Sequence, residues 1–153
     1  MTLVEMLVVL AIIAIIAGTV SLSLGSGRGL GGQVEARRLA ARLQLAADQT
    51  MITDDAIALT VRPGGYAFVA WDRTRGKWIP ETDPALGERH DLPPGLVLRS
   101  DNSRNPLPLG AEASGQAFVL TLSDNDRNWD VEFDGMTAHL SAGRLVAATG
   151  AGR

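Results

Sequence analysis

The chain has 153 residues and a formal net charge of −3, and 46% of its residues are hydrophobic. This length favours one domain, or one domain with an appendage. Acidic and basic residues are interleaved, and no dense run of lysine or arginine would neutralise nucleic-acid phosphates, which argues against a dedicated nucleic-acid-binding protein. Cysteine is absent, which excludes thiol catalysis, disulfide bonds and thiolate metal sites.

The N-terminal segment is apolar on all sides. Residues 6–27 contain no charged residue, and about 20 helical residues cover the roughly 30 Å hydrocarbon core of a bilayer. A cleavable signal peptide, the alternative, would begin with basic residues and end at an A-x-A-like site. We therefore predict a transmembrane helix over residues 1–24. Its apolar side chains include Leu3, Leu7, Leu10, Ile12, Ile13, Ile15 and Ile16.

An acid, Glu5, stands near the start of this helix. A carboxylate carried toward the bilayer centre costs up to about 2.5–3.5 kcal/mol, so it usually has a partner. The first 27 residues contain no lysine, arginine or histidine, which leaves the α-amino group of Met1, most usefully that of a neighbouring copy. The alternative is a carboxylate that lies at the headgroup level or is protonated. Met1 and Glu5 are the candidate assembly site.

A glycine-rich stretch over residues 25–32 separates this helix from a second helical pattern. Because each interior glycine costs a helix about 0.8–1.0 kcal/mol relative to alanine, we expect the helix to fray, bend or break there. A buried stripe at helical spacing then predicts a helix over residues 33–52 that lies against a sheet. The predicted flexible joint contains Gly25, Gly27, Gly29, Gly31 and Gly32, and the stripe contains Leu39, Leu43, Ala46, Ala47 and Thr50.

Short strands and turns follow the helix. Alternating apolar residues predict a hairpin of strands 56–62 and 66–71 around the turn 63–65. Further strands are expected at 96–98, 116–122, 129–133, 137–140 and 144–147, and irregular loops at 80–94 and 101–115. The turn residues suit a meander. The sequence thus predicts a globular head over residues 33–153 whose part from 56 to 148 is rich in β-structure.

No catalytic, metal or cofactor site is predicted. His90 is expected in a solvated loop and His139 half-exposed in a strand, and no G-x-S-x-G, H-E-x-x-H or phosphate-binding glycine loop occurs. The oxygen-rich stretch 123–128 raises the question of calcium. It lacks the glycine and the distant glutamate of an EF-hand loop, and Arg127 adds a repelling charge. A turn between two strands is the preferred interpretation.

Thr2-Leu3-Val4-Glu5, followed by the uninterrupted apolar residues 6–13, resembles the mature N-terminus of type IV pilins and type II secretion pseudopilins. In that family a prepilin peptidase methylates the N-terminal amine, and the acid at the fifth position is implicated in methylation and in docking onto the neighbouring subunit. The resemblance implies these roles for Met1 and Glu5. The head resembles the GspH-type minor pseudopilin in the segments 35–39, 65–68, 71–78 and 143–145.

The resemblance implies an α+β, ladle-shaped pilin-like fold, with a long N-terminal transmembrane helix packed on a C-terminal antiparallel β-sheet head. It implies a minor pseudopilin near the tip of a type II secretion pseudopilus, in the bacterial inner membrane as a single-pass protein with its head in the periplasm. The implied partners are other major and minor pseudopilins, the inner-membrane assembly platform, the prepilin peptidase and membrane lipid.

Two other functions are considered. A FimT-like minor pilin of a type IV pilus would bind DNA through a cluster of arginines on the head. The candidates are Arg99, Arg104, Arg127, Arg144 and Arg153, although acids surround several of them. A membrane-anchored enzyme would require turnover that depends on His90 or His139. Neither nucleic acid nor a cofactor is the expected ligand.

Overall fold

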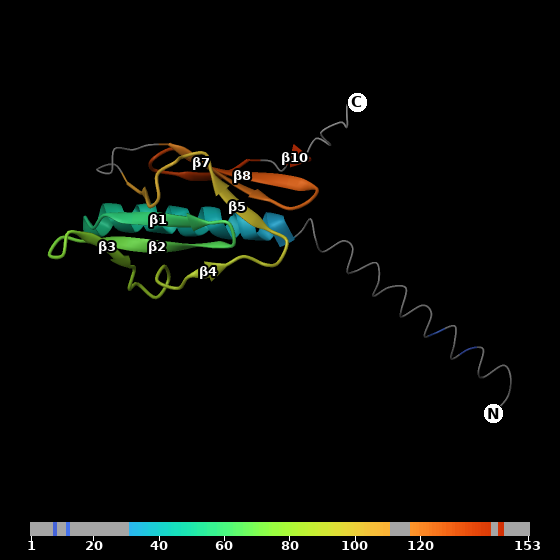
Figure 1. Ribbon diagram of the computed structural model, residues 1–153, viewed down its shortest axis with the longest axis horizontal. Helices are drawn as coiled ribbons and strands as arrows, with labels where there is room; N and C mark the ends of the chain where they lie inside the picture. The colour runs from blue at the N-terminus through green and yellow to red at the C-terminus, as the bar shows by residue number, and fades with distance from the viewer. Residues whose placement is uncertain (1–7, 9–11, 13–30, 111–116, 142–143, 146–153) are drawn as a thin grey trace. The chain divides into compact units, whose positions relative to one another are not determined.

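A computed structural model describes residues 8, 12, 31–110, 117–141 and 144–145, the last two by their backbone (Figure 1). The chain divides into two compact units, Met1–Gly31 and Gly32–Arg153. In the first unit the described residues, Val8, Ile12 and Gly31, are helical. No helix in the described part of the chain is long and apolar enough to cross a membrane. The predicted span over residues 1–24 lies outside the described residues except for Val8 and Ile12.

The long helix is described over residues 31–53, which contain the predicted helix 33–52. Gly31 and Gly32, the last two glycines of the predicted joint, are helical. Its predicted stripe is buried from Leu39 to Ala47. The helix ends at Asp54, which has a left-handed backbone (φ 56°) and whose amide donates to the Thr50 carbonyl at 3.1 Å.

Five strands form the first sheet. They are β1 (Ile57–Arg62), β2 (Gly65–Asp72), β3 (Lys77–Pro80), β4 (His90–Asp91) and β6 (Leu107–Pro108). Their order is β3-β2-β1-β6, and β4 pairs with the start of β2, all antiparallel. The tight turn after Arg62 brings Ile57 opposite Ala70 and Leu59 opposite Phe68, which confirms the predicted hairpin.

The second sheet contains the remaining strands. They are β5 (Val97–Ser100), β7 (Phe118–Ser123), β8 (Arg127–Phe133), β9 (Ala138–Leu140) and β10 (Arg144–Leu145). Their order is β10-β8-β7-β5, and β9 pairs with β8. Asp124 closes the turn between β7 and β8 by accepting the amides of Asp126 and Arg127 at 2.8 and 2.7 Å. This confirms the turn predicted for residues 123–128.

Asp134 closes the next turn of the meander in the same way. Its Oδ1 accepts the amides of Thr137 and Met136, and its Oδ2 accepts the Thr137 hydroxyl. These hydrogen bonds, led by the Thr137 amide and hydroxyl, lower the pKa of Asp134 to about 2. The local chemistry of one aspartate thus determines each of these two tight turns.

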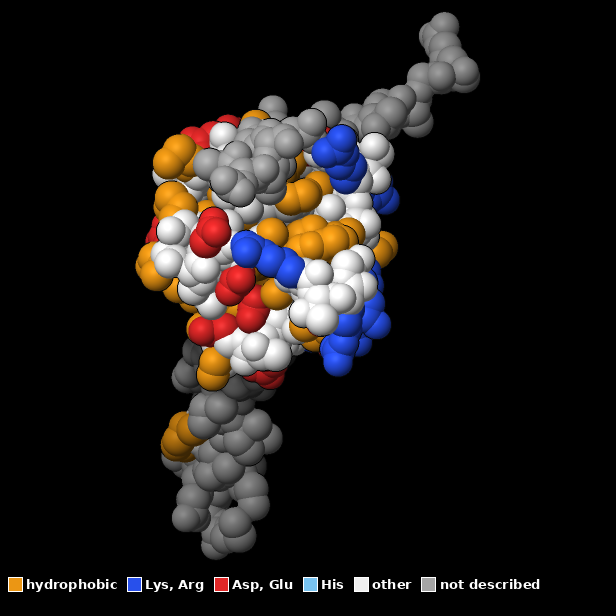
Figure 2. Space-filling model, turned by 90° about the vertical axis from the view of Figure 1, so that its left-hand side faces the viewer, with side chains coloured by type: hydrophobic (Ala, Val, Ile, Leu, Met, Phe, Trp, Pro, Cys, Tyr) orange, Lys and Arg blue, Asp and Glu red, His pale blue; other side chains and the backbone are white. Residues whose placement is uncertain are grey.

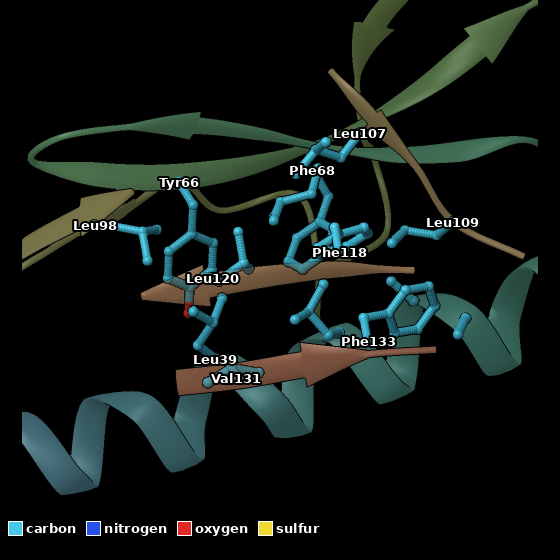
Figure 3. Packing of buried hydrophobic residues seen from close by; sticks show 14 of the residues in the cluster. Leu39, Tyr66, Phe68, Leu98, Leu107, Leu109, Phe118, Leu120, Val131 and Phe133 are labelled. Carbon is cyan, nitrogen blue, oxygen red and sulfur yellow. The ribbon is translucent and has the colours of Figure 1, made fainter. Parts of the chain in front are cut away.

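One hydrophobic core lies between the helix and both sheets (Figure 3). The helix contributes leucines and alanines such as Leu39, the first sheet contributes Tyr66 and Phe68, and the second contributes aromatic residues such as Phe133. Gln44 fastens the helix to the β8–β9 turn, since its Oε1 accepts the Ala138 amide at 3.0 Å. The α+β architecture with one helix on antiparallel strands agrees with the prediction.

Two details of the predicted head were wrong. The strands form two sheets rather than one. The segments 80–94 and 101–115 are not wholly irregular, because β4 and β6 lie within them. They also supply buried core side chains, namely Leu86, Leu107 and Leu109. Two-residue strands are too short to show an alternating pattern, so only pairing with β1 and β2 reveals them.

Candidate functional site

Most of the predicted assembly residues cannot be placed in the fold. Met1, Leu3, Glu5, Leu7, Leu10, Ile13, Ile15 and Ile16 lie outside the described residues, as do Gly25, Gly27 and Gly29 of the predicted joint. Ile12 is helical and exposed. Of the predicted assembly, membrane-helix and joint residues, the structure therefore describes only Ile12, Gly31 and Gly32.

At that point Gly32 makes a close contact with the core. A Cβ atom at Gly32 would overlap the six-membered ring of Trp129, which is 3% exposed on β8. A Cβ atom at Gly31 would meet nothing within 4 Å. The two neighbouring glycines thus have different roles, since only Gly32 lets the helix backbone approach β8 closely.

A polar cluster lies between the start of the helix and the segment around β4. His90 Nε2 and Glu35 Oε2 are hydrogen-bonded at 2.7 Å, and these side chains are 16% and 9% exposed. The other oxygen of Glu35 contacts Arg38 Nη1 at 3.4 Å. The His90 ring lies 5.0 Å from the Tyr66 ring. His90 is therefore not the solvated loop residue that the sequence suggested.

Arg42 completes this cluster from the next turn of the helix. Its Nη2 donates to the carbonyls of Ala85, Leu86 and Glu88 at 3.2, 3.3 and 3.0 Å. Its guanidinium carbon lies 5.5 Å from the ring centroids of both Tyr66 and Phe68, within cation–π range. The helix therefore holds the 81–91 segment at two places, through Glu35 and through Arg42.

This polar cluster fits a structural role better than a catalytic one. A general base needs access to a substrate proton, whereas the Glu35–His90 pair is largely covered by the helix and the core. Tyr66, whose ring lies 5.0 Å from that of His90, is fully buried. Among the described residues, no three acidic or histidine side chains could hold a metal ion. One sequence signal was available: Glu35 lies four residues before Leu39 on the buried stripe, and a buried acid requires a partner.

Replacing Tyr66 with phenylalanine is expected to leave stability at pH 7 unchanged or slightly higher. The buried Tyr66 hydroxyl has no hydrogen-bond partner by distance and angle, although Arg42 lies close enough to interact with it. Because Arg42 keeps its carbonyl acceptors in the 81–91 segment, removing the hydroxyl leaves no buried donor unpaired. Burial raises the pKa of Tyr66 above 10.0, and the nearby Arg42 opposes this shift only in part. The wild type should therefore lose stability as pH rises above about 10, where only the unfolded phenol ionises. Urea unfolding at pH 7 and pH 10.5 measures both effects, and an equal alkaline loss in Tyr66→Phe would contradict this account.

The second sheet carries a small acidic pocket of about 230 Å³. Asp101, Glu132 and Asp134 line it together with Phe118 and His139. The oxygens of Asp134 are already hydrogen-bonded in its turn, and Asp101 Oδ1 accepts the Val119 amide at 2.9 Å. His139 is exposed on β9 and contacts Thr137 Oγ1 at 3.0 Å. These contacts account for Asp101 and Asp134 through local turn and strand geometry.

Three of the five arginines considered for DNA binding have described side chains. Arg99, Arg104 and Arg127 are exposed, and the Arg127 turn contains the acids Asp124 and Asp126. The side chains of Arg144 and Arg153 lie outside the description.

Two comparisons with known proteins point to the same group, while no protein-family model matches the chain. The chain is 28% identical over 111 residues to type II secretion system protein H of Pseudomonas aeruginosa, an alignment that covers 71% of this chain and 61% of that protein. The chain thus spans about three fifths of that relative's length.

The fold is similar to that of the minor pseudopilin EpsH from the type II secretion system of Vibrio cholerae. The TM-score is 0.60 at 15% sequence identity, and the similarity covers 78% of this chain and 99% of that one. Sequence and fold therefore agree with the resemblance drawn from the amino-acid motifs, and the chain is similar to the GspH-type minor pseudopilins of type II secretion systems.

Proposed function

We propose that this chain is a minor pseudopilin of a type II secretion system. It would occupy a position near the tip of the periplasmic pseudopilus and help to push folded proteins through the outer-membrane channel. The observation that supports this most is the similarity of 78% of this chain to nearly the whole of a solved minor pseudopilin, with a sequence relative of the same kind. No enzymatic step is proposed.

In the proposed mechanism, the N-terminal segment and the head have different roles. The apolar segment over residues 1–24 anchors the subunit in the inner membrane and then packs with the same segments of other pseudopilins. Glu5 is neutralised by the N-terminal amine of a neighbour, because an unpaired carboxylate is costly away from water. A prepilin peptidase would process and methylate that terminus, and an assembly platform would drive insertion.

The head would transmit force as a rigid body. Its long helix is held on both sides, by Gln44 against the β8–β9 turn and by Arg42 and Glu35 against the 81–91 segment. A displacement of the helix along its axis would therefore move both sheets together. This rigidity supports a role as a mechanical subunit.

Replacing Glu5 with alanine tests the proposal. The full-length variant is expressed in a host that lacks the natural gene, and its recovery in sheared filament fractions and the amount of secreted protein are measured. Both are expected to fall at least tenfold, because losing one charge-paired contact of about 1.4 kcal/mol changes an equilibrium tenfold. Circular dichroism should be unchanged.

Glu132→Gln is the matched control, since Glu132 is an exposed acid on β8. It should leave incorporation and secretion at the wild-type level. Normal incorporation of Glu5→Ala, or equal losses in both variants, would contradict the proposed role of Glu5.

A further inference from the structure

The side of the long helix that faces away from the core carries apolar residues. At 3.6 residues per turn, positions 34, 41, 45 and 52 lie within about 20° of one line along the helix, and the buried Leu43 lies on the opposite side. Val34, Leu45 and Ile52 are 55%, 42% and 83% exposed, and Ala41 is exposed as well. A surface helix normally carries charged and polar residues there. These four exposed apolar residues are called the outer seam.

The spacing of the outer seam is symmetric about position 43. Its members follow one another at intervals of seven, four and seven residues, as the core positions of a coiled coil do. Reversing the helix about position 43 therefore places Val34 at the level of Ile52 and Ala41 at the level of Leu45. Two copies packed helix against helix in antiparallel orientation would form apolar layers that each pair a smaller side chain with a larger one.

Charged residues beside the outer seam match in the same orientation. Arg37 and Asp48 lie about 40–60° to the same side of the seam, and neither has an ion pair among the described residues. Asp48 Oδ1 accepts the Gln44 side-chain amide at 2.8 Å, a contact that leaves its charge in place. A two-fold axis across an antiparallel pair brings equal flanks together, so Arg37 would lie about 1.5 Å along the axis from the level of the partner's Asp48. Arg38 reaches the same level, although it already contacts Glu35 at 3.4 Å.

These charges select the antiparallel orientation. In a parallel pair of two copies, Arg37 would face Arg37 and Asp48 would face Asp48, and like charges at one level repel each other. The cations lie in the first half of the helix, and exposed Asp54 and Asp55 follow its end. Figure 2 views the end of the head at which the helix ends, and hydrophobic and acidic side chains lie side by side there. The surface around the outer seam is therefore complementary to its own reverse.

We propose that the outer seam binds the outer seam of a second copy of this chain, helix against helix in antiparallel orientation. A second copy fits better than another protein, because one surface supplies both halves of the match in side-chain size and in charge. This inference goes beyond the proposed function. Subunits of one filament point in one direction, so the antiparallel pair is a form of the subunit outside the filament. The glycines of the predicted joint would let both N-terminal segments enter one membrane from opposite ends of the pair.

Disulfide cross-linking of the full-length chain in detergent tests the orientation. The chain has no cysteine, so Val34→Cys and Ile52→Cys each introduce a single thiol at an exposed position. The two variants carry different tags, and they are mixed, oxidised and separated on a non-reducing gel. We expect a disulfide between the two variants and little dimer of Val34→Cys alone. In the antiparallel pair the two copies of position 34 are about 27 Å apart along the axis, whereas a disulfide needs Cα atoms within about 7 Å. Arg104→Cys, at an exposed loop position, mixed with Ile52→Cys is the control.

Charge reversal tests the partner. Asp48→Arg should lower the yield of the mixed disulfide about fivefold or more, because both symmetry-related ion pairs become repulsions. Adding Arg37→Asp to the same chain should restore the yield, since each copy then presents the reversed pair. Asp126→Arg, which changes the net charge equally at an exposed turn position, should leave the yield unchanged. Urea midpoints of all variants show that the head remains folded.

Each outcome decides the inference. A mixed yield no higher than that with Arg104→Cys, or an unchanged yield in Asp48→Arg, would overturn the pairing. Efficient dimerisation of Val34→Cys alone would show a parallel pair and contradict the proposed orientation. Glu5→Ala alters the N-terminal segment and not the outer seam, so the proposed function and this pairing can fail separately.

Discussion

Replacing His90 with alanine is expected to lower the free energy of unfolding by about 1–3 kcal/mol, because removing one partner of a largely buried hydrogen bond leaves the other partner, Glu35, unsatisfied. Glu35, 9% exposed, would keep only Arg38 at 3.4 Å as a charged neighbour. Tyr66 would also lose its contact with the imidazole ring. Urea denaturation followed by circular dichroism measures the change.

His139→Ala is the matched control for this prediction. His139 is exposed on β9, and surface substitutions usually change stability by less than about 0.5 kcal/mol. A double variant, Glu35→Leu with His90→Leu, removes both partners of the contact, so it can be compared with the variants that remove only one. It should be more stable than either single variant, because no buried charge is left without a partner. Equal, small effects of His90→Ala and His139→Ala would show that the 2.7 Å contact contributes little.

Replacing Gly32 with alanine is expected to destabilise the head by up to about 2 kcal/mol. Overpacking a core costs about 1–3 kcal/mol, which exceeds the roughly 1 kcal/mol that alanine gains over glycine inside a helix. The obstacle is the Trp129 ring, which a Cβ atom at Gly32 would overlap. Because that ring is buried, it can yield only by disturbing its neighbours. The shift in the urea midpoint measures the effect.

The adjacent glycine offers a control of opposite sign. Gly31→Ala adds the same methyl group to the same helix, where nothing lies within 4 Å, so stability should rise by up to about 1 kcal/mol. Trp129→Phe removes the outer ring and should abolish the penalty at position 32 in a double-mutant cycle. A stabilising effect of Gly32→Ala in the wild-type background would contradict the predicted overlap.

Local sequence patterns predicted the helix and the hairpin strands of the head, but they did not predict which distant segments pair or pack together. The helix was visible because Leu39, Leu43 and Ala46 repeat at helical spacing, and these residues are buried as expected. The hairpin of β1 and β2 was visible because its strands alternate around a proline-glycine turn. Such signals lie within a few residues of one another, so sequence alone carries them. The assignment of Leu107 and Leu109 to the core needed the pairing of β6 with β1.

The candidate sites show the same division. Three features could be recognised from the sequence alone: the apolar segment, the acid Glu5 within it and the resemblance to pseudopilins. Each depends on residue type and spacing along one stretch of chain. Only the tertiary structure decided that His90 meets Glu35, that Gly32 meets Trp129, and that the outer seam faces away from the core. The first two contacts join residues far apart in sequence, and the exposure of the outer seam depends on which side of the helix the core covers. Burial and charge pairing therefore become visible only after the chain has folded.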